Sequence, residues 1–219
     1  MKWEVVVNFS LHVINFFLFC AAYKRSPLSL QLMGIAVLVT FFVELYAVQL
    51  MLKSIDNNFI YHFLTPVQYS IFALSYMVKI RNRQVKKIIL FSIPAALIVS
   101  AFITIFWQGL NEYNSIFCSI KHALLSFWIL WFFMETFMSE NKINLVREPF
   151  FWISAGLLLS SLGNFFIEGL MNLLISKSND IALRFYLIGV SLTYIFYFTV
   201  SLGFLLQLFF KNKSALGNG

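Results

Sequence analysis

The sequence predicts an all-α membrane protein, a bundle of seven transmembrane helices. Of its 219 residues, 60% are hydrophobic and 11% are charged, against roughly 25% charged in an ordinary soluble domain. The mean hydropathy is +0.82. The apolar residues also fall into seven runs, each long enough for the ~20 residues that a helix needs to cross a bilayer.

Short polar connections separate the seven runs. We expect helices at Trp3–Ala22, Leu30–Leu52, Phe59–Ile80, Ile88–Gln108, Ser115–Met138, Pro149–Ile175 and Ile181–Phe210. The last run is long enough to tilt or to continue past the membrane. Residues 1–210 therefore form one transmembrane domain, and residues 211–219 form a short polar cytoplasmic tail.

Lysine and arginine set the expected orientation. Eleven of them follow the first, third, fifth and seventh runs: Lys24, Arg25, Lys79, Arg81, Arg83, Lys86, Lys87, Lys142, Arg147, Lys211 and Lys213. Cytoplasmic loops carry the excess of basic residues, so the N-terminus is expected outside and the C-terminus inside, in a bacterial inner membrane. In a chain this apolar, the net charge of +7 marks orientation and excludes nucleic acid as a partner.

The third run carries the clearest polar pattern. Between Asn58 and Tyr76 it contains no Asp, Glu, Lys or Arg. Its polar side chains recur at the spacing of one helix face: Tyr61, His62, Thr65, Gln68 and Tyr69. Unpaired polar groups are costly in lipid, so this face should point at other helices or at a wet cavity.

Polar residues of the other runs fall in the same, outer half of the membrane. We infer a polar pocket that opens outward and binds or transports a small polar molecule. Its candidate ligand-binding residues are Glu44, His62, Gln68, Lys121, Glu168 and Arg184.

These candidate residues have distinct expected roles. The carboxylates of Glu44 and Glu168 would neutralise a cation or carry a proton. Lys121 and Arg184 would hold an anionic group, which His62 and Gln68 would orient. The alternative is that the two acids and two bases form interhelical ion pairs that hold the bundle together, since charges inside membranes are commonly paired.

A metal site is the weaker interpretation of the histidines. His12, His62 and His122 come from three helices, and three His with a water would suit zinc. Seven-helix hydrolases of the ceramidase and progestin-receptor type use such a site, but with paired His and an intramembrane Asp. Here each His stands alone and both Asp lie in loops, so we expect hydrogen-bonded structural histidines, no metal and no cofactor. Cys20 and Cys118 are expected at opposite membrane faces, where they cannot form a disulfide.

Two segments of the chain are alike. Phe41 begins FFVELYAVQLML and Phe165 begins FFIEGLMNLLI, and each places a Glu after the same kind of triplet. This predicts two parallel three-helix repeats joined by the fourth helix, a plan known among transporters. The arrangement resembles that of sugar-carrying SWEET and semiSWEET proteins and of Pnu-type vitamin-precursor transporters. Their Pro-Gln signature is absent, because Pro66 and Gln68 are separated by Val67.

The segments NFIYHFLTPVQY, from Asn58, and EPFFWISAG, from Glu148, are similar to those of small uncharacterised bacterial seven-helix membrane proteins, a resemblance that implies no activity. Two other functions stay open. A sensor or receptor would signal through a separate partner, because no output domain is present. A lipid hydrolase would use Glu44 or Glu168 with His62 as acid and base. A homo-oligomer also stays open.

Overall fold

The computed structural model describes residues 3–139 and 144–210, and in them it is built from helices. The elements are α1 (Trp3–Ala22), α2 (Leu28–Leu52), α3 (Asn58–Lys79), α4 (Arg83–Phe106), α5 (Ser115–Phe137), α6 (Pro149–Gly169), α7 (Met171–Lys177) and α8 (Asn179–Phe210), with short 3₁₀ turns at Tyr23–Arg25 and Leu145–Arg147. The all-α class is confirmed for these residues. The expected tail at 211–219, and Lys142 in the loop before α6, lie outside them.

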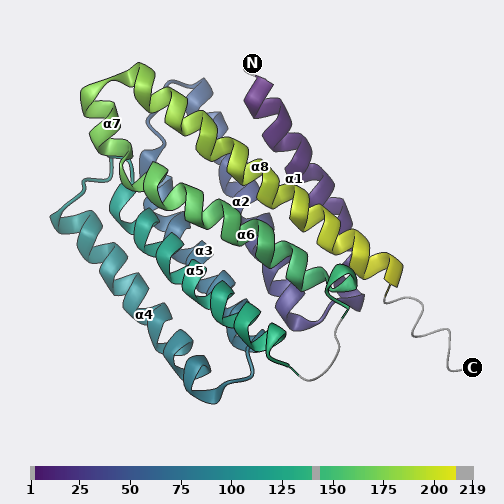
Figure 1. Cartoon of the computed structure of the whole chain (residues 1–219). Helices are drawn as coiled ribbons and strands as arrows, with labels where there is room; N and C mark the ends of the chain where they lie inside the picture. The colour runs from purple at the N-terminus through teal and green to yellow at the C-terminus, as the bar shows by residue number, and fades with distance from the viewer. Residues whose placement is uncertain (1–2, 140–143, 211–219) are drawn as a thin grey trace, which may run out of the picture.

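Six of the described helices, namely α1, α2, α4, α5, α6 and α8, are long and apolar enough to cross a bilayer, as in an integral membrane protein. Large apolar side chains cover much of their outer surface, including Phe17, Phe91, Ile98 and Phe198. The 22-residue α3 is not one of the six. Its polar face lowers its hydropathy, and it packs against α2, α4 and α5 (Figure 1).

The sixth predicted run, Pro149–Ile175, is not one helix. It breaks at Leu170 into α6 and the short α7. The break follows Gly169, a residue that weakens helices. Beyond it, Asn172 donates hydrogen bonds to the Tyr113 carbonyl (2.9 Å) and the Ser115 hydroxyl (3.1 Å). These bonds hold α7 against the α4–α5 loop and turn the chain toward α8.

Six long helices form a closed ring in the described part of the chain. In ring order they are α1, α2, α3, α5, α6 and α8, and α8 packs back against α1. The fourth helix lies outside this ring, mainly against α3, and forms one edge of the molecule (Figure 1). The largest buried cluster fills the interior and includes Tyr69, Tyr76, Phe150 and Phe204.

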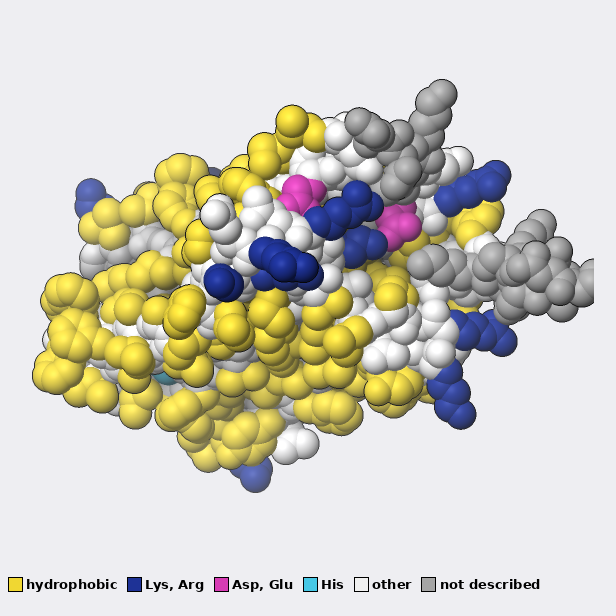
Figure 2. Space-filling view, turned by 90° about the horizontal axis from the view of Figure 1, so that it is seen from below, with side chains coloured by type: hydrophobic (Ala, Val, Ile, Leu, Met, Phe, Trp, Pro, Cys, Tyr) yellow, Lys and Arg dark blue, Asp and Glu magenta, His cyan; other side chains and the backbone are white. Residues whose placement is uncertain are grey.

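The two ends of the bundle differ in charge. At one end, which we call the basic end, lie Lys24, Arg25, Lys79, Arg81, Arg83, Lys86, Lys87 and Arg147. Contacts draw these segments together, since Lys79 pairs with Glu148 (2.9 Å) and Arg147 lies over the Phe210 ring. Figure 2 shows basic side chains gathered on the face seen from below, with acidic side chains among them and apolar side chains around.

At the basic end, the turn between α3 and α4 is fastened to α5 by one carboxylate. Glu135 accepts hydrogen bonds from the backbone nitrogens of Arg81 (2.7 Å) and Asn82 (3.0 Å) and from the Trp131 indole nitrogen (3.0 Å). The Asn82 side chain in turn accepts from the backbone nitrogen of Gln84 (2.8 Å), which caps the start of α4.

The close packing of α6 on α8 depends on glycine. A Cβ added at Gly156 would lie 2.8 Å from the Cβ of Thr199 on α8, a branched side chain that cannot swing away. We expect Gly156→Ala to cost about 1 kcal/mol of stability through overpacking, measured as a lower Tm in detergent. Gly109→Ala is the matched control, because nothing lies within 4 Å of its added Cβ. Equal Tm changes in the two variants would contradict the close approach.

Candidate functional site

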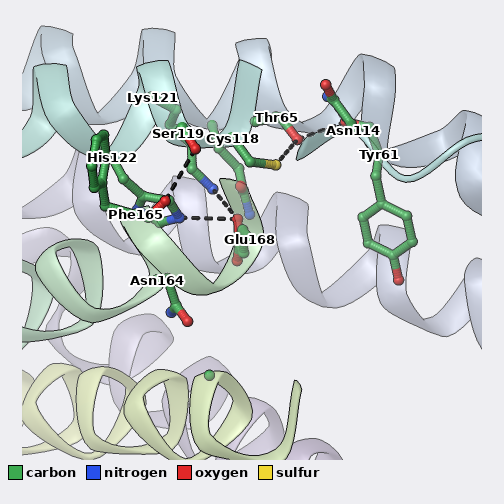
Figure 3. Close-up of polar contacts among 12 residues, drawn as sticks. Tyr61, Thr65, Asn114, Cys118, Ser119, Lys121, His122, Asn164, Phe165 and Glu168 are labelled. Carbon is green, nitrogen blue, oxygen red and sulfur yellow. Dashed lines mark hydrogen bonds and ion pairs between the residues drawn. The ribbon is translucent and has the colours of Figure 1, made fainter. Parts of the chain in front are cut away.

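The strongest polar cluster joins α5 to α6 near the end of the bundle opposite the basic end. The Glu168 carboxylate lies 3.1 Å from His122 Nε2 and 4.0 Å from Lys121 Nζ. All three side chains are mostly buried, with exposed fractions of 22%, 7% and 11% for Glu168, His122 and Lys121. We call this group, together with Cys118 and Thr65, the Glu168 cluster (Figure 3).

Helical spacing explains how α5 supplies three members of the cluster. Cys118, Lys121 and His122 lie three and four residues apart and so share one face of the helix. The Cys118 thiol lies 3.8 Å from the Thr65 hydroxyl of α3, and Figure 3 shows it beside Glu168. Ser119, next along the chain, donates to the Phe165 carbonyl (3.0 Å) and ties α5 to α6.

The Lys121–Glu168 contact is long for an ion pair. At the basic end, Lys79 and Glu148 approach to 2.9 Å, although Lys79 is 31% exposed against 11% for Lys121 and the two glutamates are about equally exposed. Charge-assisted hydrogen bonds between N–H and carboxylate groups normally close to about 2.7–2.9 Å. The opposite charges of the Glu168 cluster are therefore held near each other without direct hydrogen bonding, and His122 Nδ1 has no partner among the described residues.

Glu44 lies in a second, less charged environment. Its two carboxylate oxygens lie 3.3 Å from the Tyr61 hydroxyl of α3. No described Lys or Arg forms an ion pair with it. Glu44 and Glu168 thus occupy like positions in the two similar segments, but only Glu168 has a basic neighbour in the described residues.

Two of the predicted site residues hold helices together. His62 Nδ1 lies 2.8 Å from the Thr104 hydroxyl of α4, and Nε2 lies 3.1 Å from the Glu112 carbonyl. A carbonyl only accepts, so Nε2 donates its proton to the Glu112 carbonyl. Gln68 donates to the Thr40 hydroxyl of α2 (2.7 Å). Both side chains bond away from the Glu168 cluster.

Arg184 does not join the other predicted site residues. Its guanidinium pairs with Asp180, one turn earlier on α8, at 3.1 Å, and both side chains are more than 70% exposed. The two interhelical ion pairs considered from the sequence thus reduce to one interhelical contact, between Lys121 and Glu168, and one surface pair within α8.

The three histidines have separate surroundings. His12 stacks on Phe41 and lies 4.3 Å, centroid to centroid, from the Tyr197 ring, whereas His62 and His122 have the partners given above. In the described part of the chain, no three His, Cys, Asp or Glu side chains come close enough to hold a metal ion. The two cysteines are free, Cys20 exposed and Cys118 buried.

A cavity of about 200 Å³ lies at the basic end, lined by Lys79, Arg81, Phe132, Glu135, Thr136 and Glu148. The Glu168 cluster lies toward the other end, where its polar groups contact one another. Binding of a molecule there requires side chains or helices to separate.

Cys118 and Thr65 belong to the cluster but are not among the site residues predicted from the sequence. Spacing could have placed Cys118 there, since it lies one helical turn from His122. Comparison with known proteins adds no family, because the chain matches no family model, no curated protein and no solved structure.

Proposed function

We propose that the chain is a seven-helix integral membrane protein that binds and transports a small zwitterionic molecule at the Glu168 cluster. The observation that carries this proposal is the buried Lys121–Glu168 pair, whose charged atoms lie 4.0 Å apart without a direct hydrogen bond and would separate to admit a ligand. A molecule with an ammonium and a carboxylate group could bind between them, its ammonium on Glu168 and its carboxylate on Lys121. His122 would support the ammonium-binding carboxylate from the other side.

The seven spans of this proposal are the six apolar helices together with α3. The polar face of α3 bonds to its neighbours: Tyr61 to Glu44, His62 to Thr104, Gln68 to Thr40 and Tyr69 to Ser92. These partners offset the cost of polar groups at membrane depth. The concentration of basic residues at one end supports an N-terminus outside and a cytoplasmic C-terminus, as in a bacterial inner membrane.

The order of the ring supports a transporter with two parallel repeats. Moving halfway around the ring replaces α1, α2 and α3 by α5, α6 and α8, and leaves α4 outside as a connecting helix. The same operation exchanges the FFVE segment of α2 and the FFIE segment of α6, and these two helices contact each other across the ring. Parallel repeats of this kind place substrate sites at the repeat interface.

The standard amino acids are the probe that tests this function. Added one at a time to purified protein in detergent, at least one is expected to raise the Tm, because a ligand that binds the folded state stabilises it. Glu168→Gln should abolish this rise, whereas Arg184→Met, which changes a charge on the surface, should keep it. A Tm unmoved by every amino acid would contradict zwitterion binding. An amino acid that raises the Tm would then be tested for uptake into vesicles.

A further inference from the structure

A line of polar side chains continues from the Glu168 cluster toward the basic end. Asn164, one turn from Glu168 on α6, has its Nδ2 3.4 Å from the Thr193 hydroxyl of α8. Thr193, Tyr197 and Ser201 follow one another at single turns of α8. The line therefore passes from α6 to α8 and runs along α8 through the middle of the bundle.

The first helix completes this line. The Asn15 side chain donates to the Tyr197 carbonyl (3.1 Å) and accepts from the Ser201 hydroxyl (3.0 Å). His12, one turn before, packs against the Tyr197 ring. Closer to the basic end, Gln207 of α8 donates to the Arg25 carbonyl at 2.5 Å. We call this set the polar seam: Asn164, Thr193, Tyr197, His12, Asn15, Ser201 and Gln207.

Several polar atoms of the seam are buried without a partner among the described residues. They are both ring nitrogens of His12, Oδ1 of Asn164 and Oε1 of Gln207, in side chains that are 1%, 2% and 0% exposed, respectively. Fewer than about one in ten buried polar groups in native proteins lacks a hydrogen-bond partner. Such atoms are typically satisfied by internal water.

One apolar contact interrupts the seam. The rings of Phe19 and Phe204 meet at a centroid distance of 5.4 Å, and the two side chains are 5% and 0% exposed. In the chain, Phe204 lies between Ser201 and Gln207. On α2, Gly34 leaves room for Phe19, since a Cβ there would lie 2.8 Å from Phe19 Cγ. We call this pair the Phe plug.

We propose that the polar seam is a proton path between the Glu168 cluster and the basic end, closed by the Phe plug. Internal waters would link the unpartnered atoms. His12 would pass a proton by binding it on one ring nitrogen and releasing the proton of the other to the next water, so that one N–H bond forms as one breaks. The titratable groups around His12 are Tyr197 from α8 and, near Tyr197, Glu44 from α2. The proposal rests on the proposed function for its membrane orientation. The proton path would couple ligand binding at Glu168 to proton movement.

The test measures proton entry into vesicles that hold a pH-sensitive dye, driven by a potassium gradient and valinomycin. Wild type is expected to admit few protons, because the plug is closed. Phe204→Ala should raise proton entry clearly above wild type, and adding His12→Phe should return it to the wild-type rate. Ser191→Ala, an exposed serine on the same helix as Ser201, is the control and should leave the Phe204→Ala rate unchanged.

Phe19→Ala, from the other side of the plug, repeats the test if Phe204→Ala does not give folded protein. The proposal is overturned if opening the plug does not increase proton entry, or if His12→Phe leaves the increased rate intact in protein that retains its Tm. The amino-acid Tm assay detects binding at Glu168 without any proton movement. If the proton path fails but an amino acid still shifts the Tm, the proposed function stands and the proton path is overturned. If protons enter as expected but no amino acid shifts the Tm, the proton path stands and the proposed function is overturned.

Discussion

Lys121→Met is expected to lower the free energy of unfolding by about 3 kcal/mol, because it leaves the Glu168 carboxylate buried without its cation. The two charged groups are largely shielded from solvent, with exposed fractions of 11% for Lys121 and 22% for Glu168. The measurement is detergent or denaturant unfolding of the purified protein. Arg184→Met is the matched control, because its pair with Asp180 is exposed on α8 and such pairs contribute about 0–1 kcal/mol.

The double variant Lys121→Met/Glu168→Gln sharpens this prediction. Removing both charges also removes the unpaired buried carboxylate, so the double variant should be more stable than Lys121→Met alone. A double variant whose loss equals the sum of the two single losses would show that the groups do not interact. That result would remove the basis for treating Lys121 and Glu168 as one site.

His62→Phe is expected to cost about 2 kcal/mol, because two hydrogen bonds of about 1 kcal/mol each are lost while the apolar volume is kept. These bonds join the buried ring to Thr104 and to the Glu112 carbonyl. Thr104→Val, which removes one of the two bonds, should cost about half as much by the same reasoning. Binding of an amino acid at Glu168 should survive in His62→Phe, since His62 lies outside the Glu168 cluster. If His62→Phe keeps its stability but loses amino-acid binding, His62 belongs to the ligand site instead.

The helices could be predicted from the sequence to within a few residues at most ends. The largest differences have local causes. Helix α4 begins at Arg83, five residues before the predicted Ile88, because the Asn82 side chain caps its start. The first turn of α4 is charged, so a hydropathy pattern cannot detect it. The break at Leu170 depends on bonds from Asn172 to the α4–α5 loop, which no local pattern reveals.

Only the site residues whose helical spacing places them on a polar face could be predicted from the sequence. Lys121 and Glu168 are brought together as expected of partnered charges, since each lies on the polar face of its helix. Arg184 lies apart from the Glu168 cluster, and the sequence could not show this, because α8 is apolar on nearly all sides and does not reveal which face meets the bundle. Glu44 and Gln68 have close partners in Tyr61 and Thr40, yet spacing along one helix cannot identify a partner on another.

The connection between site and seam also depends on tertiary structure. Asn15, Ser201 and Gln207 look like isolated polar residues in apolar runs. They line up only because α1 packs beside α8. This contact places polar groups together in the half of the bundle near the basic end.

The central claim is that the Glu168 cluster is a binding site reached from the end of the bundle opposite the basic end. Native Cys118 tests it most directly, because this thiol lies within the cluster and is buried when the site is closed. In a Cys20→Ser background, we expect a small membrane-impermeant thiol reagent to modify Cys118 when added from the side opposite the basic end, and not from the basic side. Folded protein whose Cys118 resists the reagent from both sides, while the unfolded chain reacts, would contradict the account.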